Sequence, residues 1–409
     1  MITFHWKDKE KAIKEAFTTT DKTLIENKER GKNTDNTNNL IIEGDNLDVL
    51  KLLKKDYQGR VKCIYIDPPY NTGKDFVYTD KRHKKGECKH SKWLSFMYPR
   101  LVMAKEMLRE DGVIFVSIDD NEVHHLRIMM NEIFGEGEFV ANVIWEKKFS
   151  PQNDAKWLSN THDYIICFAR DKDIWRPNLL ARTSKQNDRY SNPDNDPRGD
   201  WTSSDFSVKT YSPEYDYPIT TPSGKIIELP PGRCWMTSKK KMKELQDDNR
   251  LFFGKTGGNV PRLKRFLSEV KQGITPVTIL YRNDVGDTQM AKKDLLSIMP
   301  ENMFDTPKPV SLIKHLLKIS TKPNDLILDF FAGSGTTGQA VMELNEEDGK
   351  ECNRQFILVQ LPEEIDKKKE AYKAGYNKIS DITIERVKRA GDKYPNVDTG
   401  FKVLKTITN

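Results

Sequence analysis

The chain has no apolar run long enough to cross a bilayer. Stretches such as residues 112–118 and 164–169 fall well short of the roughly 18 residues that a spanning helix needs. Residues 1–7 also lack the basic segment followed by an apolar stretch that marks a secretory signal. We therefore expect a cytoplasmic protein that does not associate with a membrane.

Cysteine is scarce, with five residues in a chain of 409, at positions 63, 88, 167, 234 and 352. An odd, scattered set of cysteines argues against a disulfide framework and for a reducing compartment. Internal repeats and low-complexity tracts are missing too, so the length predicts roughly two to three ordinary globular domains.

Positive charge is in small excess, with 67 basic and 61 acidic residues. The segment 231–271, with eleven basic and four acidic residues, accounts for the whole excess. Basic charge gathered in one segment indicates contact with a polyanion, and a merely solvated surface is the alternative. The candidate phosphate contacts are Arg233, Lys239, Lys240, Lys241, Lys243, Lys255, Arg262, Lys264 and Arg265.

Strand and helix patterns alternate through residue 170 and return near residue 310. Strands are predicted over 40–43, 61–66, 113–118, 139–145, 163–168, 326–329 and 356–359, and helices over 9–17, 47–54, 95–109, 311–320 and 337–345, with another from about 121. This alternation predicts an α/β fold with a doubly wound, mostly parallel sheet. Residues 171–300 are rich in turn-forming residues and show no long periodic segment, which indicates an inserted domain or a set of long loops.

A glycine-rich motif, Leu328–Gly338, stands where a strand turns into a helix. Gly333 and Gly335 permit a tight turn that approaches a ligand closely, and Asp329 can accept hydrogen bonds from an ammonium group. The glycine spacing matches the dinucleotide fingerprint, but the next strand ends in Gln360 where that fingerprint has an acid. No Gly-Lys-Ser/Thr ending follows, so a triphosphate loop is not predicted.

The motif Asp67-Pro68-Pro69-Tyr70 follows another buried strand. Two successive prolines fix the backbone and remove two donors, which leaves the Pro68 carbonyl and the Asp67 carboxylate as a rigid pair of acceptors. Such a pair suits a planar base with an exocyclic amine, on which Tyr70 can stack. An ordinary proline-rich turn is the alternative.

These motifs closely resemble those of the β-class DNA amino-methyltransferases, and among them the modification subunits of type III restriction–modification systems. The resemblance covers nearly the whole chain, through Ile42–Leu47, Tyr65–Gly73, Trp93–Arg100, Asp111–Asp120, Phe304–Pro309 and Phe331–Thr337. It implies a Rossmann-like fold with a circularly permuted motif order. The implied segments are an N-terminal helix and polar loop (1–39), a catalytic half (40–170), a target-recognition region (171–300) and a cofactor-binding half (301–409).

The resemblance implies transfer of a methyl group from S-adenosylmethionine to N6 of an adenine flipped out of double-stranded DNA. Asp67 and Pro68 would hold the amine, Pro69 would stiffen the turn, and Tyr70 would stack on the base. The two motif loops would follow adjacent strands. The implied cofactor site comprises Asp45, Lys308, Asp329, Phe331, Ala332, Gly333, Ser334, Gly335, Thr336 and Gln360, with Gln360 standing where many relatives have an acid.

A restriction subunit and a second copy of the chain are further partners that the resemblance implies. N4-cytosine methylation remains an alternative, although those enzymes usually carry serine where Asp67 stands. An inactive DNA-binding subunit is a second alternative. Methylation of a protein glutamine is disfavoured, because that reaction uses a similar turn in which asparagine stands at the position of Asp67. None of the cysteines follows a proline, so the cysteine chemistry of cytosine C5 methylation is not supported.

Histidines suggest no metal site by their spacing. The set of His83, Cys88 and His90 fits no closed zinc site and is expected in an exposed basic loop over 81–92. His124 and His125 are expected to form a surface pair on a helix. Residues His162–Tyr164 are expected to border the target pocket.

Overall fold

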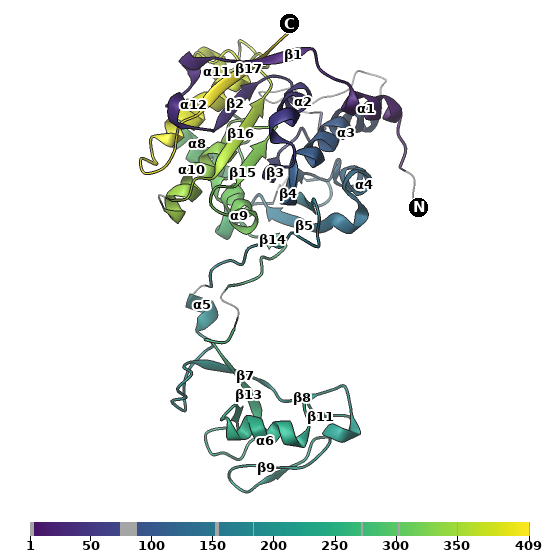
Figure 1. The fold of residues 1–409 in the computed structure, drawn as a ribbon, viewed down its shortest axis with the longest axis vertical. Coiled ribbons are helices and arrows are strands. Elements are labelled where there is room, and N and C mark those ends of the chain that lie inside the picture. Colours follow the sequence, from purple (N-terminus) through teal and green to yellow (C-terminus); the bar gives the residue numbers. More distant parts are fainter. Residues whose placement is uncertain are drawn as a thin grey trace. The chain divides into compact units, whose positions relative to one another are not determined.

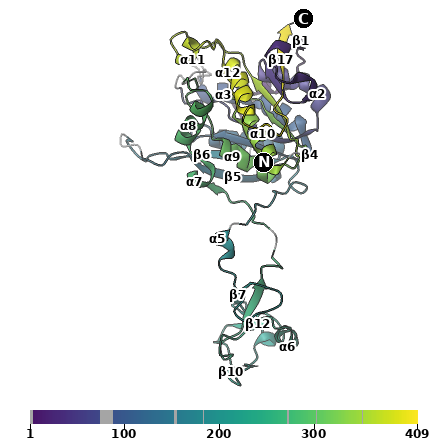
Figure 2. The same ribbon diagram turned by 90° about the vertical axis from the view of Figure 1, so that its left-hand side faces the viewer.

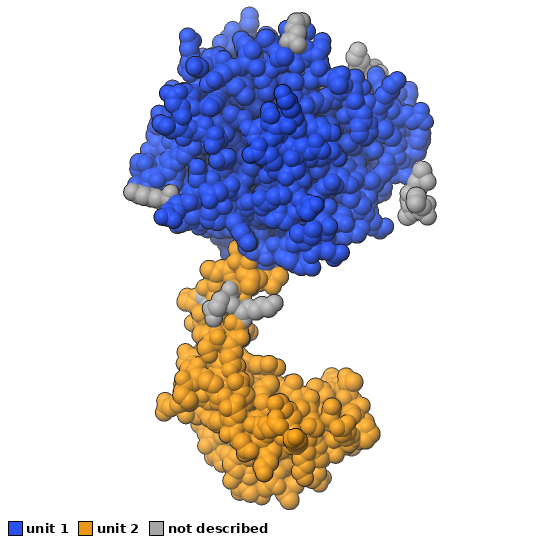
Figure 3. Space-filling view, viewed as in Figure 1, with its two compact units in different colours: residues 1–178, 276–409 blue, residues 179–275 orange. Residues whose placement is uncertain are grey.

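A computed structural model describes residues 4–73, 88–151, 155–182, 184–270, 273–301, 303–349 and 351–408. It divides into two compact units: unit 1 comprises residues 1–178 and 276–409, and unit 2 comprises residues 179–275 (Figure 3). Within the described part of the chain, no helix is both long enough and apolar enough to span a membrane.

A ten-stranded sheet forms the centre of unit 1 (Figure 1). Its order is β1 (Lys22–Glu26), β17 (Lys402–Thr408), β2 (Leu40–Glu43), β16 (Gln355–Gln360), β15 (Leu326–Asp329), β3 (Val61–Ile66), β4 (Leu108–Ile118), β6 (His162–Ala169), β5 (Phe139–Glu146) and β14 (Ile279–Leu280). Strands β2 and β3 are buried along their whole length, as continuous apolar strands covered on both faces must be.

Most strand pairs in this sheet are parallel, which confirms the predicted fold class. The antiparallel pairs are β1 with β17, and β6 with both β4 and β5. The alternation of elements did not predict the reversed direction of β6, because a short apolar strand carries no signal of its direction. Strand β4 begins at Leu108, five residues before the predicted start.

Two sets of helices cover the sheet (Figures 1 and 2). One set is α1 (Lys9–Phe17), α2 (Asn46–Tyr57), α3 (Lys89–Met107) and α4 (Val123–Phe134), and the other is α8 (Thr288–Ile298), α9 (Val310–Ser320), α10 (Thr336–Asp348) and α12 (Ile379–Gly391). Short elements join them: α7 (Arg282–Val285), α11 (Glu370–Lys373), and the 3-10 turns η1 (Lys28–Arg30), η2 (Thr34–Asn36) and η3 (Glu136–Glu138). Helix α3 begins within the loop predicted over 81–92, of which residues 81–87 lie outside the described residues.

Unit 2 is built from short strands and one longer helix. Its elements are α5 (Ser184–Asn187), β7 (Trp201–Asp205), β8 (Ser207–Val208), η4 (Pro213–Tyr215), β9 (Ile219–Thr220), β10 (Ile226–Ile227), β11 (Cys234–Trp235), α6 (Lys239–Asp247), β12 (Leu251–Phe252) and β13 (Arg262–Phe266). The expectation of no periodic segment over 171–300 was wrong for α6 and α8. Both helices carry many polar residues, which obscured the spacing of their apolar positions in the sequence. In α6 the buried apolar residue is Met242.

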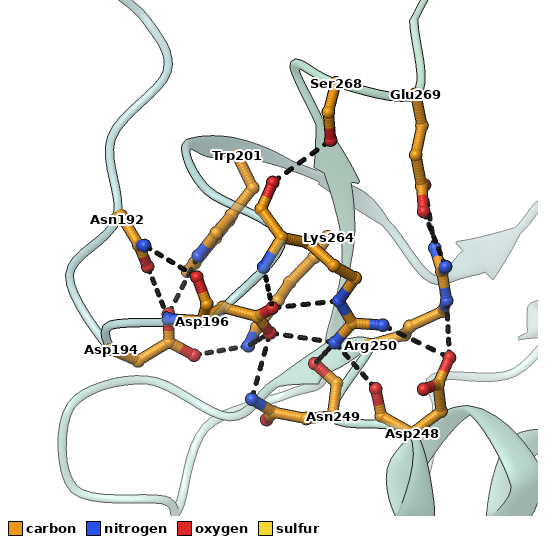
Figure 4. A network of polar contacts seen from close by, with 11 residues as sticks. Asn192, Asp194, Asp196, Trp201, Asp248, Asn249, Arg250, Lys264, Ser268 and Glu269 are labelled. Carbon is orange, nitrogen blue, oxygen red and sulfur yellow. Dashed lines mark hydrogen bonds and ion pairs between the residues drawn. The ribbon is translucent and has the colours of Figure 1, made fainter.

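A buried polar cluster supplements the small hydrophobic core of unit 2 (Figure 4). The ammonium of Lys264 is fully buried and pairs with Asp194 and, at 3.3 Å, with Asp196. Arg198 lies 2.8 Å from Asp196 and donates hydrogen bonds to it, which holds the pKa of that carboxyl far below its usual range. Buried charges are stable only when paired in this way, so the cluster fixes the strands that carry it.

Candidate active site

A cleft of about 910 Å³ opens where β3 and β15 end. These strands are parallel neighbours, with Ile327 opposite Cys63 and Leu328 opposite Ile64. The loop with Asp67 and the loop with Gly333 therefore leave the sheet side by side, and both line the cleft. The prediction that the two motif loops follow adjacent strands is confirmed.

Asp67 places its two carboxylate oxygens in different environments. The Oδ2 atom lies 2.5 Å from Nζ of Lys308. The Oδ1 atom is buried and has no hydrogen-bond partner among the described residues. Because a buried acceptor without a partner is costly, this atom is suited to receive a hydrogen bond from a ligand.

The prolines after Asp67 are held in place by Trp93. Its indole Nε1 donates a 2.7 Å hydrogen bond to the Pro69 carbonyl. The Pro69 carbonyl therefore already has a hydrogen-bond partner. The cleft wall includes Asp67 and Pro69 but, within the described structure, neither Pro68 nor Tyr70.

Tyr70 carries a buried hydroxyl that has no hydrogen-bond partner among the described residues. Burial raises its pKa well above the ordinary value, so the side chain is a neutral phenol. The ammonium of Lys308 lies 5.1 Å from the centre of its ring. Stacking of Tyr70 on a base stays a prediction.

The glycine-rich turn is fixed by hydrogen bonds to its backbone. The Asp329 carboxyl accepts from Phe331 N at 3.0 Å and from the hydroxyl of Thr337 at 2.5 Å. The Gln360 amide oxygen accepts from Gly333 N at 2.8 Å. Asp329 and Gln360 thus shape the turn as well as lining the cleft, beside the predicted Phe331, Ala332, Gly333, Ser334 and Thr336.

Gly335 differs from the other residues of the turn because it packs against α12. Its φ of +84° is left-handed, and an added Cβ would lie 3.0 Å from the Thr383 carbonyl and 2.9 Å from Val387. Gly335 is absent from the cleft wall described here. Its role as a cofactor contact stays a prediction.

Asp329 has an unusual charge state for a carboxyl. It is almost fully buried, and burial raises its pKa to about 7, with the negative charge of Asp67 adding to the rise. Near neutral pH a substantial fraction of it is therefore protonated. A cation that enters the cleft favours the ionised form.

Two further predicted cofactor residues make contacts that the sequence did not reveal. Lys308 pairs with Asp67. Asp45 caps α2 by accepting from Leu47 N at 2.9 Å, and it pairs with Arg100 at 2.9 Å. Both residues still line the cleft, so they remain candidates for the cofactor.

Helix α12 packs against the glycine-rich turn and donates hydrogen bonds to it. The sequence did not predict this contact. The fully buried Arg386 donates 2.6 Å hydrogen bonds to the hydroxyls of Ser334 and Thr336 and further bonds to the amide oxygen of Gln339. Burial lowers the pKa of Arg386 to about 10. A signal was present, because residue 386 shares the helical face of Ile382 and Ala390.

The predicted basic segment is mostly exposed in unit 2. The exposed members are Lys239, Lys240, Lys241, Lys243, Lys255, Arg262 and Arg265, with Arg233 half-buried. Lys264 is the exception, since it is fully buried against Asp194 and Asp196. Lys264 is thus a structural cation and not a phosphate contact.

The histidine expectations are partly corrected. His83 lies outside the described residues. His124 is exposed, as predicted, but His125 turns toward Glu122. Within the predicted pocket border, Asp163 pairs with Lys147 at 2.5 Å and Tyr164 donates to Asp120, and neither side chain lines the cleft.

Comparison with known proteins gives a consistent family assignment. Residues 61–371 match the model of a family described as DNA methylase. The Mod subunit of the StyLTI type III restriction-modification enzyme from Salmonella typhimurium is 39% identical over 93% of this chain and 61% of its own length. The EcoPI Mod subunit from Escherichia phage P1 is 36% identical over 94% of this chain and 68% of its own.

A third relative is similar in size to this chain. The type II methyltransferase M.KpnI from Klebsiella pneumoniae is 33% identical over 91% of this chain and 92% of its own length. By contrast, the chain spans only about two thirds or less of the Mod subunits it matches.

Proposed function

The chain belongs to the DNA methylase family, and from this premise we propose that it transfers a methyl group from S-adenosylmethionine to N6 of adenine in double-stranded DNA. One observation carries the proposal. Asp67, whose buried Oδ1 has no hydrogen-bond partner among the described residues, lines the cleft at the end of β3, one strand away from the glycine turn.

Asp67 and the Pro68 carbonyl would accept the two hydrogen bonds of the adenine amine. Lys308 pairs with the other oxygen of Asp67. The carboxylate would therefore be oriented before the reaction begins. As the N–C bond forms, the bond between the methyl carbon and the sulfonium sulfur would break, and the amine would lose a proton. Asp67 would accept that proton, directly or through water.

The cleft wall fits S-adenosylmethionine. It offers apolar contacts from Phe304, Phe331 and Ile379, and acidic groups at Asp45 and Asp329 for the polar parts of the molecule. S-adenosylmethionine supplies an electrophilic methyl group on a sulfonium when bound. Asp329 would meet its ammonium group, and Gln360, whose side chain already holds the turn, would present its remaining amide hydrogen toward the ribose.

Unit 2 would bind the DNA. Its exposed lysines and arginines provide the phosphate contacts that position a protein on a duplex. The target adenine must leave the stack to reach the cleft, at a cost of a few kcal/mol. The hydrogen bonds from the adenine amine to Asp67 and to the Pro68 carbonyl would offset part of this free-energy cost.

The test is transfer of labelled methyl groups from S-adenosylmethionine to duplex DNA, followed by identification of the modified nucleoside. We expect N6-methyladenine. Asp67→Asn should lower kcat by about 10²–10³-fold, because it removes a positioned charge from the reacting amine. Binding of S-adenosylmethionine, measured by calorimetry, should change little.

The matched control is Asp173→Asn, which changes an exposed aspartate of unit 1. It should leave both measurements unaltered. N4-methylcytosine as the product, or full activity in Asp67→Asn, would contradict the proposal. No transfer at all would favour a DNA-binding subunit without activity.

We also propose that the chain works in the cytoplasm beside a restriction subunit and pairs with a second copy of itself. This rests on the two relatives that are named Mod subunits. Size measurement of the purified chain tests the pairing, and co-purification with a restriction subunit encoded beside it tests the partner. A monomer that retains no such subunit would oppose both statements.

A further inference from the structure

Three side chains of metal-ligating type meet at a place outside the cleft wall. His90 lies in the first turn of α3, Glu122 immediately precedes α4, and His125 lies in the first turn of α4. One ligand atom from each lies within 4.8 Å of the other two. The three residues come from the starts of two helices that pack against one another.

The contacts converge on the Glu122 carboxylate. Nδ1 of His90 lies 2.8 Å from Oε1, and Nδ1 of His125 lies 2.8 Å from Oε2. Each imidazole therefore faces a different oxygen of the same carboxylate. A third contact comes from Asn71, which donates from Nδ2 to Oε1 at 2.6 Å.

Burial makes the charge of this carboxylate costly. The Glu122 side chain is fully buried, and among the described residues no lysine or arginine pairs with it. A buried anion requires a compensating charge close by. A divalent cation held between the two imidazoles and the carboxylate would supply it.

The ligand set also has the chemistry of a known class of site. Two imidazole nitrogens and a carboxylate are ligands that zinc takes at about 2.0–2.2 Å, with further positions left to water. The imidazoles are partly exposed, at 35% for His90 and 23% for His125, which gives an ion a route inward. Asn71 would act as the outer partner that orients a ligating carboxylate.

We propose that His90, Glu122 and His125 bind one divalent transition-metal ion of the zinc class. The ion would replace the protons that the imidazoles now direct at the carboxylate. Its role would be structural, because it ties the start of α3 to the start of α4. Through Asn71, which directly follows Tyr70, it would also steady the turn that begins at Asp67.

The test is metal binding by the full chain, measured after removal of metal with a chelator. Titration with Co²⁺ should give visible absorption that saturates at one ion per chain, and Zn²⁺ should displace it. His90→Ala and His125→Ala should each weaken binding by at least about 100-fold, since loss of even an outer partner of a metal ligand costs 10–100-fold.

His124→Ala is the matched control. This exposed histidine adjoins His125, with ring centres 4.0 Å apart, but it lies outside the group. It should bind the ions as the unaltered chain does. Cys88→Ala, which changes an exposed residue near the start of α3, should also bind normally.

Two results would overturn the proposal. One is the absence of saturable Co²⁺ binding by the unaltered chain, which would leave a purely hydrogen-bonded cluster. The other is binding that survives both His90→Ala and His125→Ala. Neither measurement uses methyl transfer, so the outcome is independent of the proposed activity.

Discussion

At the scale of single residues, two carboxyl groups of the cleft lie in different electrostatic environments. Asp67 has a lysine beside it, whereas Asp329 is enclosed by backbone and a hydroxyl. Burial raises the pKa of Asp329 to about 7. The cleft thus holds one acid that is paired with a lysine and one acid whose charge depends on what enters the cleft.

The Asp329→Asn variant of the unliganded protein should be more heat-stable at pH 8. The folded pKa of about 7 exceeds the ordinary value of 3.8, so ionising Asp329 opposes folding. This destabilisation appears as the pH rises from about 4 and is complete above about 7, where it amounts to about 4 kcal/mol at most. Asparagine keeps the shape and has no charge to bury.

Thermal unfolding at pH 8 and at pH 5 checks this expectation. The gain in midpoint should be largest at pH 8 and should shrink toward pH 4. Thr337 can reverse its hydrogen bond to suit asparagine, so the turn should remain intact. An equal gain at both pH values, or a loss at pH 8, would contradict it.

At the scale of elements, α12 is as much a part of the cleft as the loops above it. Its Thr383 hydroxyl donates to the Gly333 carbonyl at 2.5 Å, and Arg386 reaches the hydroxyls of the same turn. The helix lies beyond the residues that match the family model. It positions the turn, and its first residue, Ile379, lines the cleft.

Arg386→Met should raise the KM for S-adenosylmethionine about tenfold while kcat stays within about twofold. The reason is that the turn loses hydrogen bonds from a charged donor, each worth about 1.5–3 kcal/mol. Steady-state methyl transfer separates the two constants. Arg386→Lys should restore part of the affinity.

The control for this change is Arg389→Met, on the same helix but partly exposed and paired with Glu385. It should leave the KM unaltered. A fall in kcat at constant KM would show that Arg386 does not act through the cofactor turn.

Helix α6 carries a second prediction at this scale, for DNA binding. If about six cations of unit 2 meet phosphates, affinity should fall with salt at a log–log slope of about −5. The pair Lys239→Gln and Lys240→Gln should reduce the slope to about −3, because two phosphate contacts are lost. Fluorescence anisotropy at several salt concentrations measures it.

The pair Lys367→Gln and Lys368→Gln is the matched control, since it removes the same charge from exposed lysines of unit 1. It should keep the original slope. Equal slopes for the two double variants would place the DNA elsewhere than on α6.

These elements also show what the sequence could predict. The catalytic and glycine motifs were placed correctly because each ends a buried strand, and parallel neighbours bring such ends together. The burial of Lys264 could not be predicted, because its partners Asp194 and Asp196 lie about seventy residues away. The meeting of His90 with Glu122 likewise depends on tertiary packing that no local spacing records.

At the scale of the whole molecule, the described residues of each unit include a hydrophobic core of their own. The cleft wall is made only of unit 1 residues, while unit 2 has its own apolar cluster around Trp235 and its own buried ion pairs. We therefore expect the two units to unfold in separate steps.

Calorimetry should show two transitions, of which only one responds to a ligand of the cleft. S-adenosylhomocysteine at 100 times its Kd should stabilise unit 1 by about 2.7 kcal/mol and leave unit 2 unchanged. Lys264→Met should lower only the unit 2 transition, by about 3 kcal/mol, because it strands buried carboxylates. Lys255→Met, which alters an exposed lysine of unit 2, is the control.

A single transition that shifts as one with the ligand would refute separate unfolding. So would a Lys264→Met variant in which both transitions move together.

Unit 2 leaves the rest of the chain after Asn178 and returns to it at Pro276, and Leu180 and Ile274 form a β-bridge where the two passages meet. One genetic exchange with its breakpoints near these codons would replace the whole unit and leave every strand of the ten-stranded sheet as it was. Such an exchange would replace unit 2 and keep the residues that line the cleft.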